Sequence, residues 1–356
     1  MPAGGARRFD GLQQLRLVAA SMVALFHSGH YVATQTGTTD RFVNFWTHPF
    51  FSLGVYLFFG ISGFVLLHAL TRCPVPQFLA LRFLRIYPPF LACVALFYVA
   101  RASLLRAAPP MSFLGLTLLP FGKVDYPLGI EWSLVYEIFF YLIVALLALV
   151  RRRVIARAAY GLWAALILAA SIQGANTHFF PTFANIGLSL FNLCFIGGAL
   201  AYEFRDWLGR RPFVLAGVAI VGLVGMFPVD MSGRQFLFLP LATTSLVALA
   251  AREGGRDGAR TGGRPRSASW WLDPIVRGGD WSYGLYLLHI PVITILLGLA
   301  AAPAAASPRA AFFVVALAAL ALGLAYGALE MAAYRRVRAL VLPAGGGRLR
   351  RGAGSP

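Results

Sequence analysis

The sequence predicts an all-α fold: a polytopic transmembrane helical bundle of about ten spans, with both termini in the cytoplasm. Apolar residues make up 59% of the 356 residues and charged residues only 12%, whereas about 25% of the residues of a soluble globular chain are charged. Runs of about 20 mainly apolar residues, the length that crosses a bilayer, recur along the whole chain. This composition excludes a soluble protein.

Polar, proline-bearing or arginine-bearing breaks separate the candidate spans. The spans lie near 11–31, 49–70, 86–105, 130–150, 158–174, 185–203, 213–228, 235–250, 281–299 and 310–332. The apolar stretch 111–121 is too short to cross, so we expect a re-entrant or interfacial piece there. We assign residues 1–340 to one transmembrane domain. Within it, the Gly/Arg-rich segment 251–278 predicts a flexible cytoplasmic linker, and 341–356 a disordered basic tail.

The positive charge of the chain is explained by membrane topology. The formal net charge is +18, from 31 Lys+Arg against 13 Asp+Glu, which in a soluble chain would suggest a nucleic-acid partner. Lys and Arg accumulate in the cytoplasmic segments of membrane proteins. With the N-terminus inside, 24 of them fall on the cytoplasmic side and 6 on the opposite side, and Arg16 alone lies within a span. The charge therefore indicates orientation, and we expect no nucleic-acid partner.

The first span carries two ionisable residues, Arg16 and His27. Such residues are costly in lipid and are functional candidates by default. Eleven positions apart, they share nearly one helix face and are separated by about 16 Å along the axis. This arrangement suits a long substrate threaded along the helix. The alternatives are that Arg16 extends to the cytoplasmic headgroups and that His27 is a packing histidine, with His30 at the interface.

The fourth span opens with two carboxylates. We expect Glu131 at the interface and Glu137, which only apolar residues follow, inside the membrane. A buried carboxylate needs a cation or a proton. Glu137 is therefore expected to pair with an arginine or to orient His27; the alternative is a polar contact between helices with no chemical role.

The ninth span places polar side chains at helical spacing. Ser282, Tyr286 and His289 recur at i, i+4 and i+7, so they share one face. That face is expected to line the same cavity. An aromatic belt at the membrane interface is an equally good interpretation of Trp281 and Tyr283.

Two arginines precede the third span on its cytoplasmic side. Arg82 and Arg85 lie three apart on one helix face, and two guanidinium groups at this spacing suit bidentate phosphate binding. The alternative is a topology signal only.

The second span contains a group of small residues, which predicts close helix packing rather than catalysis. They are Gly54, Gly60, Ser62 and Gly63.

Common soluble catalytic and metal-binding motifs are absent from the sequence. There is no GxSxG elbow, no phosphate loop ending in GKS or GKT, no HExxH, and no HxxxxD. The three cysteines form no CxxC pair, so we expect neither a zinc site nor a disulfide framework. Any chemistry must use the intramembrane His, Arg and Glu side chains.

Taken together, four motifs resemble those of the integral-membrane acyltransferase family 3, whose members are bacterial O-acyltransferases of lipopolysaccharide, exopolysaccharide and Nod-factor sugars. The matching positions are Arg16 and His27; Arg82, Arg85, Ile86 and Pro88; Trp132, Ser133, Leu134 and Glu137; Ser282 through Pro291; and Glu330 near the end of the last helix. The likeness covers nearly the whole chain, and the motifs occur in the family's order.

The resemblance implies a membrane enzyme of the bacterial inner membrane that transfers an acyl group, most simply acetyl, from cytoplasmic acetyl-CoA to a glycan hydroxyl. Acyl-CoA is then a co-substrate, and no tightly bound cofactor or metal is expected. The roles implied are catalysis for His27, Arg16 and Glu137, binding of the CoA phosphates for Arg82, Arg85 and Arg16, and substrate binding for Ser133, Tyr283 and His289. His27 would act as general base, or would form an acyl-histidine. The alternative function is a transporter of a glycan or lipid-linked sugar.

Overall fold

A computed structural model describes residues 9–107, 112–150, 152–172, 178–226, 238–252 and 272–341. Within these ranges the regular secondary structure is helical, and the one β-bridge, between Phe121 and Thr182, is isolated. The prediction of an all-α fold is confirmed for this part of the chain. The helices are α1 (Asp10–Thr36), α2 (Arg41–Trp46), η1 (Pro49–Ser52), α3 (Leu53–Leu70), α4 (Val75–Leu105), α5 (Phe113–Leu116), α6 (Glu131–Leu149), α7 (Arg153–Ile172), η2 (Ile186–Leu188), α8 (Asn192–Glu203), α9 (Arg205–Leu208), α10 (Pro212–Val224), α11 (Phe238–Ala251), α13 (Leu272–Leu299), α14 (Ala301–Ala306) and α15 (Pro308–Val341).

Within the described residues, seven helical segments are long and apolar enough to cross a membrane. They are Asp10–Thr36, Arg41–Leu70, Val75–Leu105, Glu131–Leu149, Arg153–Ser171, Pro274–Leu299 and Pro308–Leu340. Each corresponds to one of the spans that the sequence predicts. The chain is therefore an integral membrane protein by the length and composition of its helices.

The other three predicted spans correspond to shorter helices. The helices α8, α10 and α11 have 12, 13 and 14 residues, whereas a span needs about 20. The apolar patterns near 185–203, 213–228 and 235–250 thus predict helices correctly. The first pattern overestimates the length of its helix, since α8 begins at Asn192. The other two patterns reach residues 227–237, which lie outside the described residues. The count of ten spans and the cytoplasmic location of the termini stay predictions.

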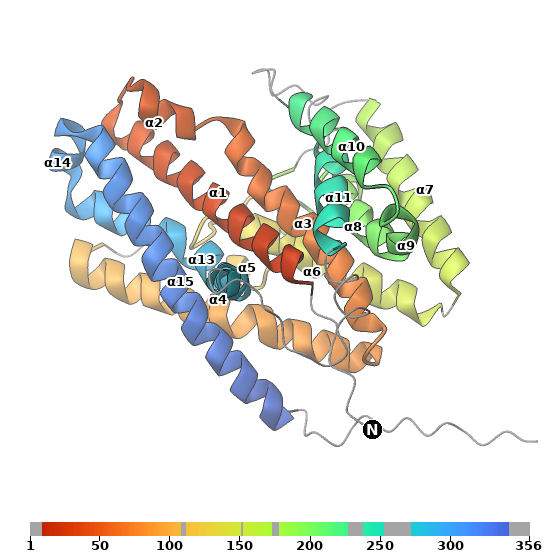
Figure 1. Ribbon diagram of the computed structural model, residues 1–356. Helices are drawn as coiled ribbons and strands as arrows, with labels where there is room; N and C mark the ends of the chain where they lie inside the picture. Colours follow the sequence, from red (N-terminus) through yellow and green to blue (C-terminus); the bar gives the residue numbers. More distant parts are fainter. Residues whose placement is uncertain are drawn as a thin grey trace, which may run out of the picture.

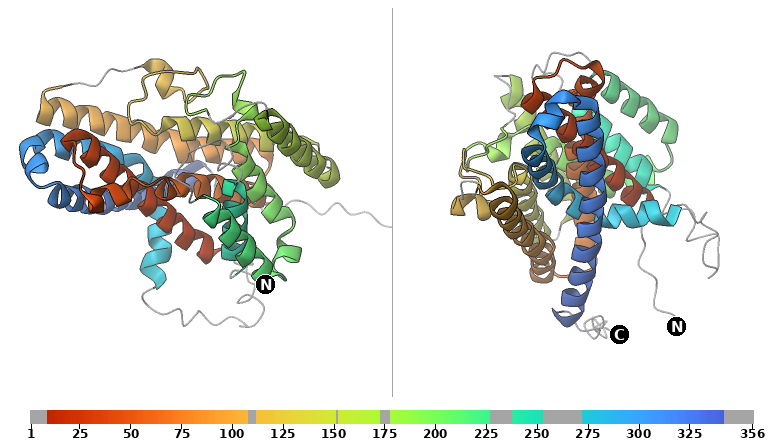
Figure 2. Two further views of the ribbon diagram at one scale, coloured as in Figure 1. Left: turned by 90° about the horizontal axis from the view of Figure 1, so that it is seen from above. Right: turned by 90° about the vertical axis from the view of Figure 1, so that its left-hand side faces the viewer.

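The long helices form one group and the short ones another. Figure 1 shows α1, α4, α13 and α15 along one part of the molecule and α7 to α11 together at the other, with α3 between them. In Figure 2, α7 lies at the periphery and α15 runs along one face of the bundle. The most extensive packing is between α13 and α15, α1 and α13, and α3 and α8. As a result, α1 and α13, which carry the two histidines of interest, lie side by side.

Glycines make two of these contacts possible. A Cβ at Gly198 of α8 would lie 1.8 Å from the carbonyl oxygen of Gly60 in α3, and a Cβ at Gly284 of α13 would lie 2.3 Å from Cα of Gly327 in α15. No side chain fits at these distances, so the helices touch backbone to backbone. The structure confirms that the small residues of the second span serve close packing.

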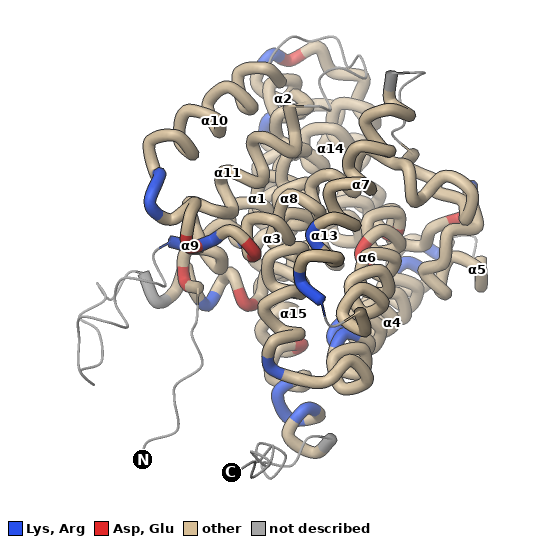
Figure 3. The backbone as a smooth tube through the Cα atoms, turned by 90° about the vertical axis from the view of Figure 1, so that its right-hand side faces the viewer, with Lys and Arg blue, Asp and Glu red and all other residues tan. Residues whose placement is uncertain are grey.

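Figure 3 shows that Lys and Arg gather toward the end of the molecule at which α15 finishes and α9 lies. At the opposite end, α2 and α14 lie near each other (Figure 1). There Arg309 of α15 donates from Nε to Asp40, just before α2, at 2.7 Å. The positive-inside rule assigns the arginine-rich end to the cytoplasm.

The segment 111–121 is described from residue 112 onward. It contains the one-turn helix α5, and the hydroxyl of Tyr87 donates to the carbonyl oxygen of Thr117 at 2.6 Å. Since Tyr87 lies near the middle of α4, this segment packs alongside α4. Its assignment as a re-entrant or interfacial piece stays a prediction. Residues 253–271 of the predicted linker and 342–356 of the predicted tail lie outside the described residues.

Candidate active site

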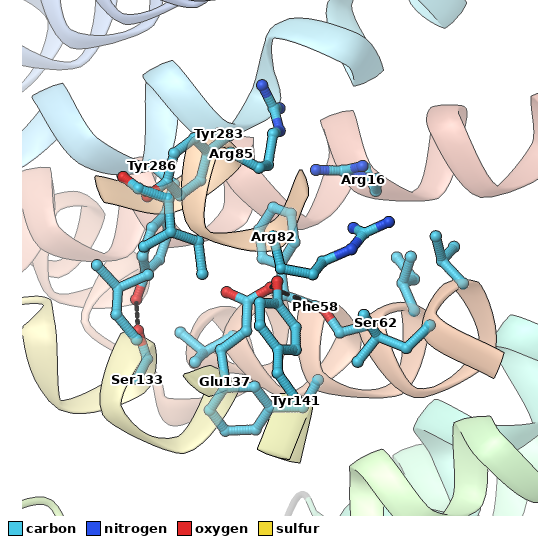
Figure 4. Close-up of a pocket in the computed structure, with 17 residues that line it drawn as sticks. Arg16, Phe58, Ser62, Arg82, Arg85, Ser133, Glu137, Tyr141, Tyr283 and Tyr286 are labelled. Atoms are coloured by element: carbon cyan, nitrogen blue, oxygen red, sulfur yellow. Dashed lines mark hydrogen bonds between the residues drawn. The ribbon is translucent and has the colours of Figure 1, made fainter. Parts of the chain in front are cut away.

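A polar cavity lies between α1, α3, α4, α6 and α13 (Figure 4). Its free volume is about 80 Å³, and Arg16, Arg82, Arg85 and Glu137 supply its charged lining. We call it the arginine cavity. Its lining includes residues from all four motifs at which the sequence analysis placed function.

Glu137 is held in this cavity by two hydroxyl groups. Ser62 of α3 donates to its Oε1 at 3.2 Å, and Tyr141, one turn along α6, donates to the same oxygen. Arg16 is close enough to interact with it electrostatically. The hydrogen bonds described for Glu137 come from Ser62 and Tyr141 and include neither an arginine nor His27, so its pairing with an arginine stays a prediction.

Arg85 already has a carboxylate partner. Its Nη1 donates to Oε1 of Glu330 in α15, and its guanidinium lies over the rings of Tyr283 and Tyr334 at 5.2 and 5.6 Å from their centroids. The side chains of Arg85 and Glu330 are 13% and 4% exposed. In Figure 4, Arg85 points away from Glu137. This arginine is fixed in a buried ion pair.

Arg16 and Arg82 differ from Arg85 in this respect. The Nε atoms of both are buried and have no hydrogen-bond partner in the part of the chain that the structure describes. Arg82 packs over the rings of Phe78 and Tyr141, at 5.5 and 6.0 Å from their centroids. A buried donor without a partner is costly, and a bound anion would satisfy both groups. The arginine cavity therefore has its free cationic capacity at Arg16 and Arg82.

The second part of the site is a pair of histidines from α1 and α13. Nε2 of His289 lies 3.0 Å from Nδ1 of His27, and the ring of His289 is 1% exposed. Nδ1 of His289 lies 2.8 Å from the carbonyl oxygen of Tyr286, and Nδ1 of His27 lies 3.1 Å from that of Val23. We call these two side chains the histidine pair.

The carbonyl groups assign the tautomers of the pair. A carbonyl only accepts, so Nδ1 of His289 carries its proton and, in the neutral ring, Nε2 carries the lone pair. Nδ1–H of His27 then donates to Nε2 of His289, which leaves the lone pair of His27 on its Nε2. One ring thus orients the other, and His27 presents a basic nitrogen.

Residues of α13 connect the arginine cavity to the histidine pair. Tyr283 and Tyr286 both line the cavity, and the ring centroid of Tyr286 lies 5.8 Å from that of His289. The hydroxyl of Ser133 donates its single proton to the carbonyl oxygen of Ile130 at 2.9 Å. Because that proton is used, Ser133 accepts the hydrogen bond from the phenol of Tyr286. This chain of contacts runs from the arginines to His289 within about two helical turns.

Comparison with known proteins now decides the family. Residues 9–328 match acyltransferase family 3, described as an acyltransferase domain. This chain belongs to acyltransferase family 3. No curated protein and no solved structure matches it. The match covers most of the chain and includes Arg16, Arg82, Glu137 and both histidines of the histidine pair, so it favours a membrane acyltransferase over a transporter.

A second carboxylate of α6, that of Glu131, lies at the first residue of the helix. Glu131 is fully buried within the protein, and its Oε1 accepts the backbone N–H of Leu128 at 2.7 Å. Its location at the membrane interface stays a prediction. Among the described residues, the other carboxylate oxygen, Oε2, has no hydrogen-bond partner.

The acyltransferase site also includes residues that the sequence did not single out for chemistry. Ser62 was interpreted as a packing residue, yet it also donates to Glu137, and Tyr141 was not considered. Tyr141 lies four residues after Glu137 and so on the same helix face, which is a signal that could have identified it. Ser62 had no such signal, because its contact joins helices 75 residues apart in sequence.

Proposed function

We propose that this acyltransferase moves an acetyl group from cytoplasmic acetyl-CoA to a hydroxyl of a cell-surface or lipid-linked glycan in the bacterial inner membrane, with His27 as general base. The histidine pair is the observation that carries this proposal. His27 lies within a span, where an ionisable residue is costly, and its Nδ1 is hydrogen-bonded so that Nε2 is free to accept a proton. General bases in hydrolases and transferases are oriented in this way by a second group.

The reaction balances with His27 alone as proton carrier. The glycan hydroxyl oxygen attacks the thioester carbon while Nε2 of His27 takes its proton. The C–S bond then breaks, and the imidazolium returns the proton to the departing CoA thiolate. During this step Nδ1–H of His27 keeps its hydrogen bond to His289, which stabilises the charged ring. His289 is thus a positioning residue.

The arginine cavity supplies the donor side of the proposal. Its three arginines face one lining carboxylate, Glu137, and CoA carries several phosphates. The cavity holds about 80 Å³, well below the roughly 300–1,000 Å³ of small-molecule pockets. We therefore assign to it a phosphate contact, with the nucleotide part of CoA outside at the cytoplasmic end and the pantetheine arm leading from the cavity to the thioester at His27. Arg82 and Arg16, which have unpartnered buried Nε atoms, are the better candidates for that contact.

Replacing Arg82 with glutamine is expected to raise the KM for acetyl-CoA by roughly tenfold, because a charge-assisted hydrogen bond contributes about 1.5–3 kcal/mol. The measurement is the initial rate of acyl transfer in membrane vesicles at varied acetyl-CoA concentration. Arg336→Gln is the matched control, since Arg336 lies exposed on α15. An unchanged KM in Arg82→Gln would leave Arg82 with a topological role only.

Two substitutions of His289 separate orientation from packing. In His289→Gln the side-chain carbonyl can still accept from Nδ1–H of His27, whereas His289→Leu offers no acceptor. We expect kcat to fall in both, by at least tenfold more in the leucine variant, with the KM for acetyl-CoA unchanged in both. Steady-state kinetics of the purified proteins measure this. Equal losses in the two variants would show that His289 does not act through its hydrogen bond to His27.

A further inference from the structure

A second cavity lies beyond the histidine pair, near the other end of α4. Its volume is about 400 Å³, within the range of roughly 300–1,000 Å³ for small-molecule sites. Its lining combines aromatic rings with charged side chains. The residues used below are Arg101, Lys123, Asp125, Tyr126, Trp132 and Phe180. We call it the aromatic cavity.

The aromatic cavity and the arginine cavity lie on opposite sides of the histidine pair. Arg82 and Arg101, one from each cavity, are 19 residues apart on α4, or about 28 Å along the helix axis. Gly129 lines the aromatic cavity, and a Cβ at this position would lie 3.8 Å from Cδ1 of Ile290. Ile290 directly follows His289. The aromatic cavity therefore adjoins α13 at the residue that follows His289.

Aromatic rings give this cavity flat apolar surfaces. Tyr126 and Phe180 stack with their ring centroids 6.1 Å apart and their planes at 7°. Trp132 packs edge to face with Phe179, with ring centroids 4.9 Å apart. The C–H face of a pyranose ring is apolar while its edge carries hydroxyl groups. It therefore suits a cavity in which aromatic faces adjoin hydrogen-bonding groups.

Polar groups in the cavity are available to a ligand. Nε of Arg101 and the hydroxyl of Tyr126 are buried, and no described residue forms a hydrogen bond with either. Burial, together with the nearby charge of Glu131, raises the pKa of Tyr126 to about 12, so the phenol keeps its proton and can donate. Unsatisfied buried donors of this kind are uncommon and call for a partner.

The charge in the cavity favours an anion. Arg101 and Lys123, the only lysine in the sequence, lie with a single lining carboxylate, Asp125. By the positive-inside assignment this end of α4 faces away from the cytoplasm, where few Lys and Arg are expected. Two of those few therefore lie in one cavity. A guanidinium group matches a carboxylate in geometry as well as in charge.

We infer that the aromatic cavity binds a carboxylate-bearing sugar residue of the acceptor glycan on the extracytoplasmic side of the acyltransferase. The sugar ring packs on Tyr126, Trp132 and Phe180, and its carboxylate meets Arg101 and Lys123. A hydroxyl of this residue or of its neighbour then faces His27. The inference rests on the proposed function for the identity of the acceptor, and on the cavity alone for the chemistry of the ligand.

Binding of a charged trisaccharide to the purified full-length protein in detergent tests this inference. The probes are trigalacturonic acid and its methyl ester, which differ in charge and have the same sugar rings. Equilibrium dialysis should show the acid bound at least tenfold more tightly by the wild type. Lys123→Gln and Arg101→Gln should each reduce this preference severalfold. Lys123 is exposed, so Lys123→Gln is expected to fold even if the Arg101→Gln protein does not fold.

The matched control is Arg41→Gln, because Arg41 is exposed at the same end of the molecule and does not line the cavity. It should keep the wild-type preference. Equal binding of acid and ester by the wild type, or the same loss in Arg41→Gln as in Lys123→Gln, would overturn the inference. Acyl transfer from acetyl-CoA is measured separately. A wild type that prefers the acid but transfers no acyl group contradicts the proposed function and not the cavity assignment.

Discussion

Replacing His27 with alanine is expected to lower the rate of acyl transfer by roughly 10²–10⁴-fold, the contribution of a positioned general base. Without the imidazole, no group takes the proton from the attacking hydroxyl at the point where Nε2 lies. The rate is measured as transfer of radiolabelled acetyl from acetyl-CoA to the cell-surface glycan. Each rate is divided by the amount of protein in the membrane, so that a folding defect is not read as a catalytic one.

His30→Ala is the matched control for this variant, because His30 lies on the next turn of α1 and is exposed. It should keep most of the activity. A His27→Ala protein that acylates at the wild-type rate would refute the role of His27, and an equal loss in His30→Ala would point to disruption of α1. Stable radiolabel on the wild type after incubation with acetyl-CoA alone would instead indicate an acyl-histidine intermediate.

The sequence predicted the long helices because a membrane span has a simple physical signature, a length of apolar residues. The sequence also identified Arg16, His27 and Glu137 as functional candidates, because ionisable residues within such a span are rare and costly. The length of α8 was overestimated for the same reason. The composition shows where an apolar stretch begins and ends. It does not show at which residue the helix within that stretch begins or ends.

The contacts between helices could not be predicted in this way. His27 and His289 are 262 residues apart in sequence, and nothing in the period of either helix indicates that their rings meet. The pairing of Arg85 with Glu330, across 245 residues, is of the same kind. Helical periodicity fixes which residues share a face of one helix, and the packing of α1, α4, α13 and α15 decides which faces meet.

Replacing Glu330 with alanine is expected to destabilise the protein by about 3–5 kcal/mol, the usual cost of removing one partner of a buried ion pair. The guanidinium of Arg85 would remain buried between the rings of Tyr283 and Tyr334 without its carboxylate. The measurement is the thermal unfolding midpoint of the detergent-purified protein. Arg335→Ala is the matched control, since the pair of Arg335 with Asp280 is 3.5 Å long and the arginine is 65% exposed. Exposed pairs of this kind contribute about 0–1 kcal/mol.

The double variant Arg85→Met/Glu330→Met shows which role Arg85 has. Removing both charges at once leaves no buried charge unpaired, so stability should return to near that of the wild type. If Arg85 is structural and Arg16 and Arg82 hold the donor, the double variant also keeps the wild-type KM for acetyl-CoA. A stable double variant with a raised KM would instead assign a CoA phosphate to Arg85, and Glu330 would then be the group that the phosphate displaces. A Glu330→Ala protein as stable as Arg335→Ala would contradict the ion pair itself.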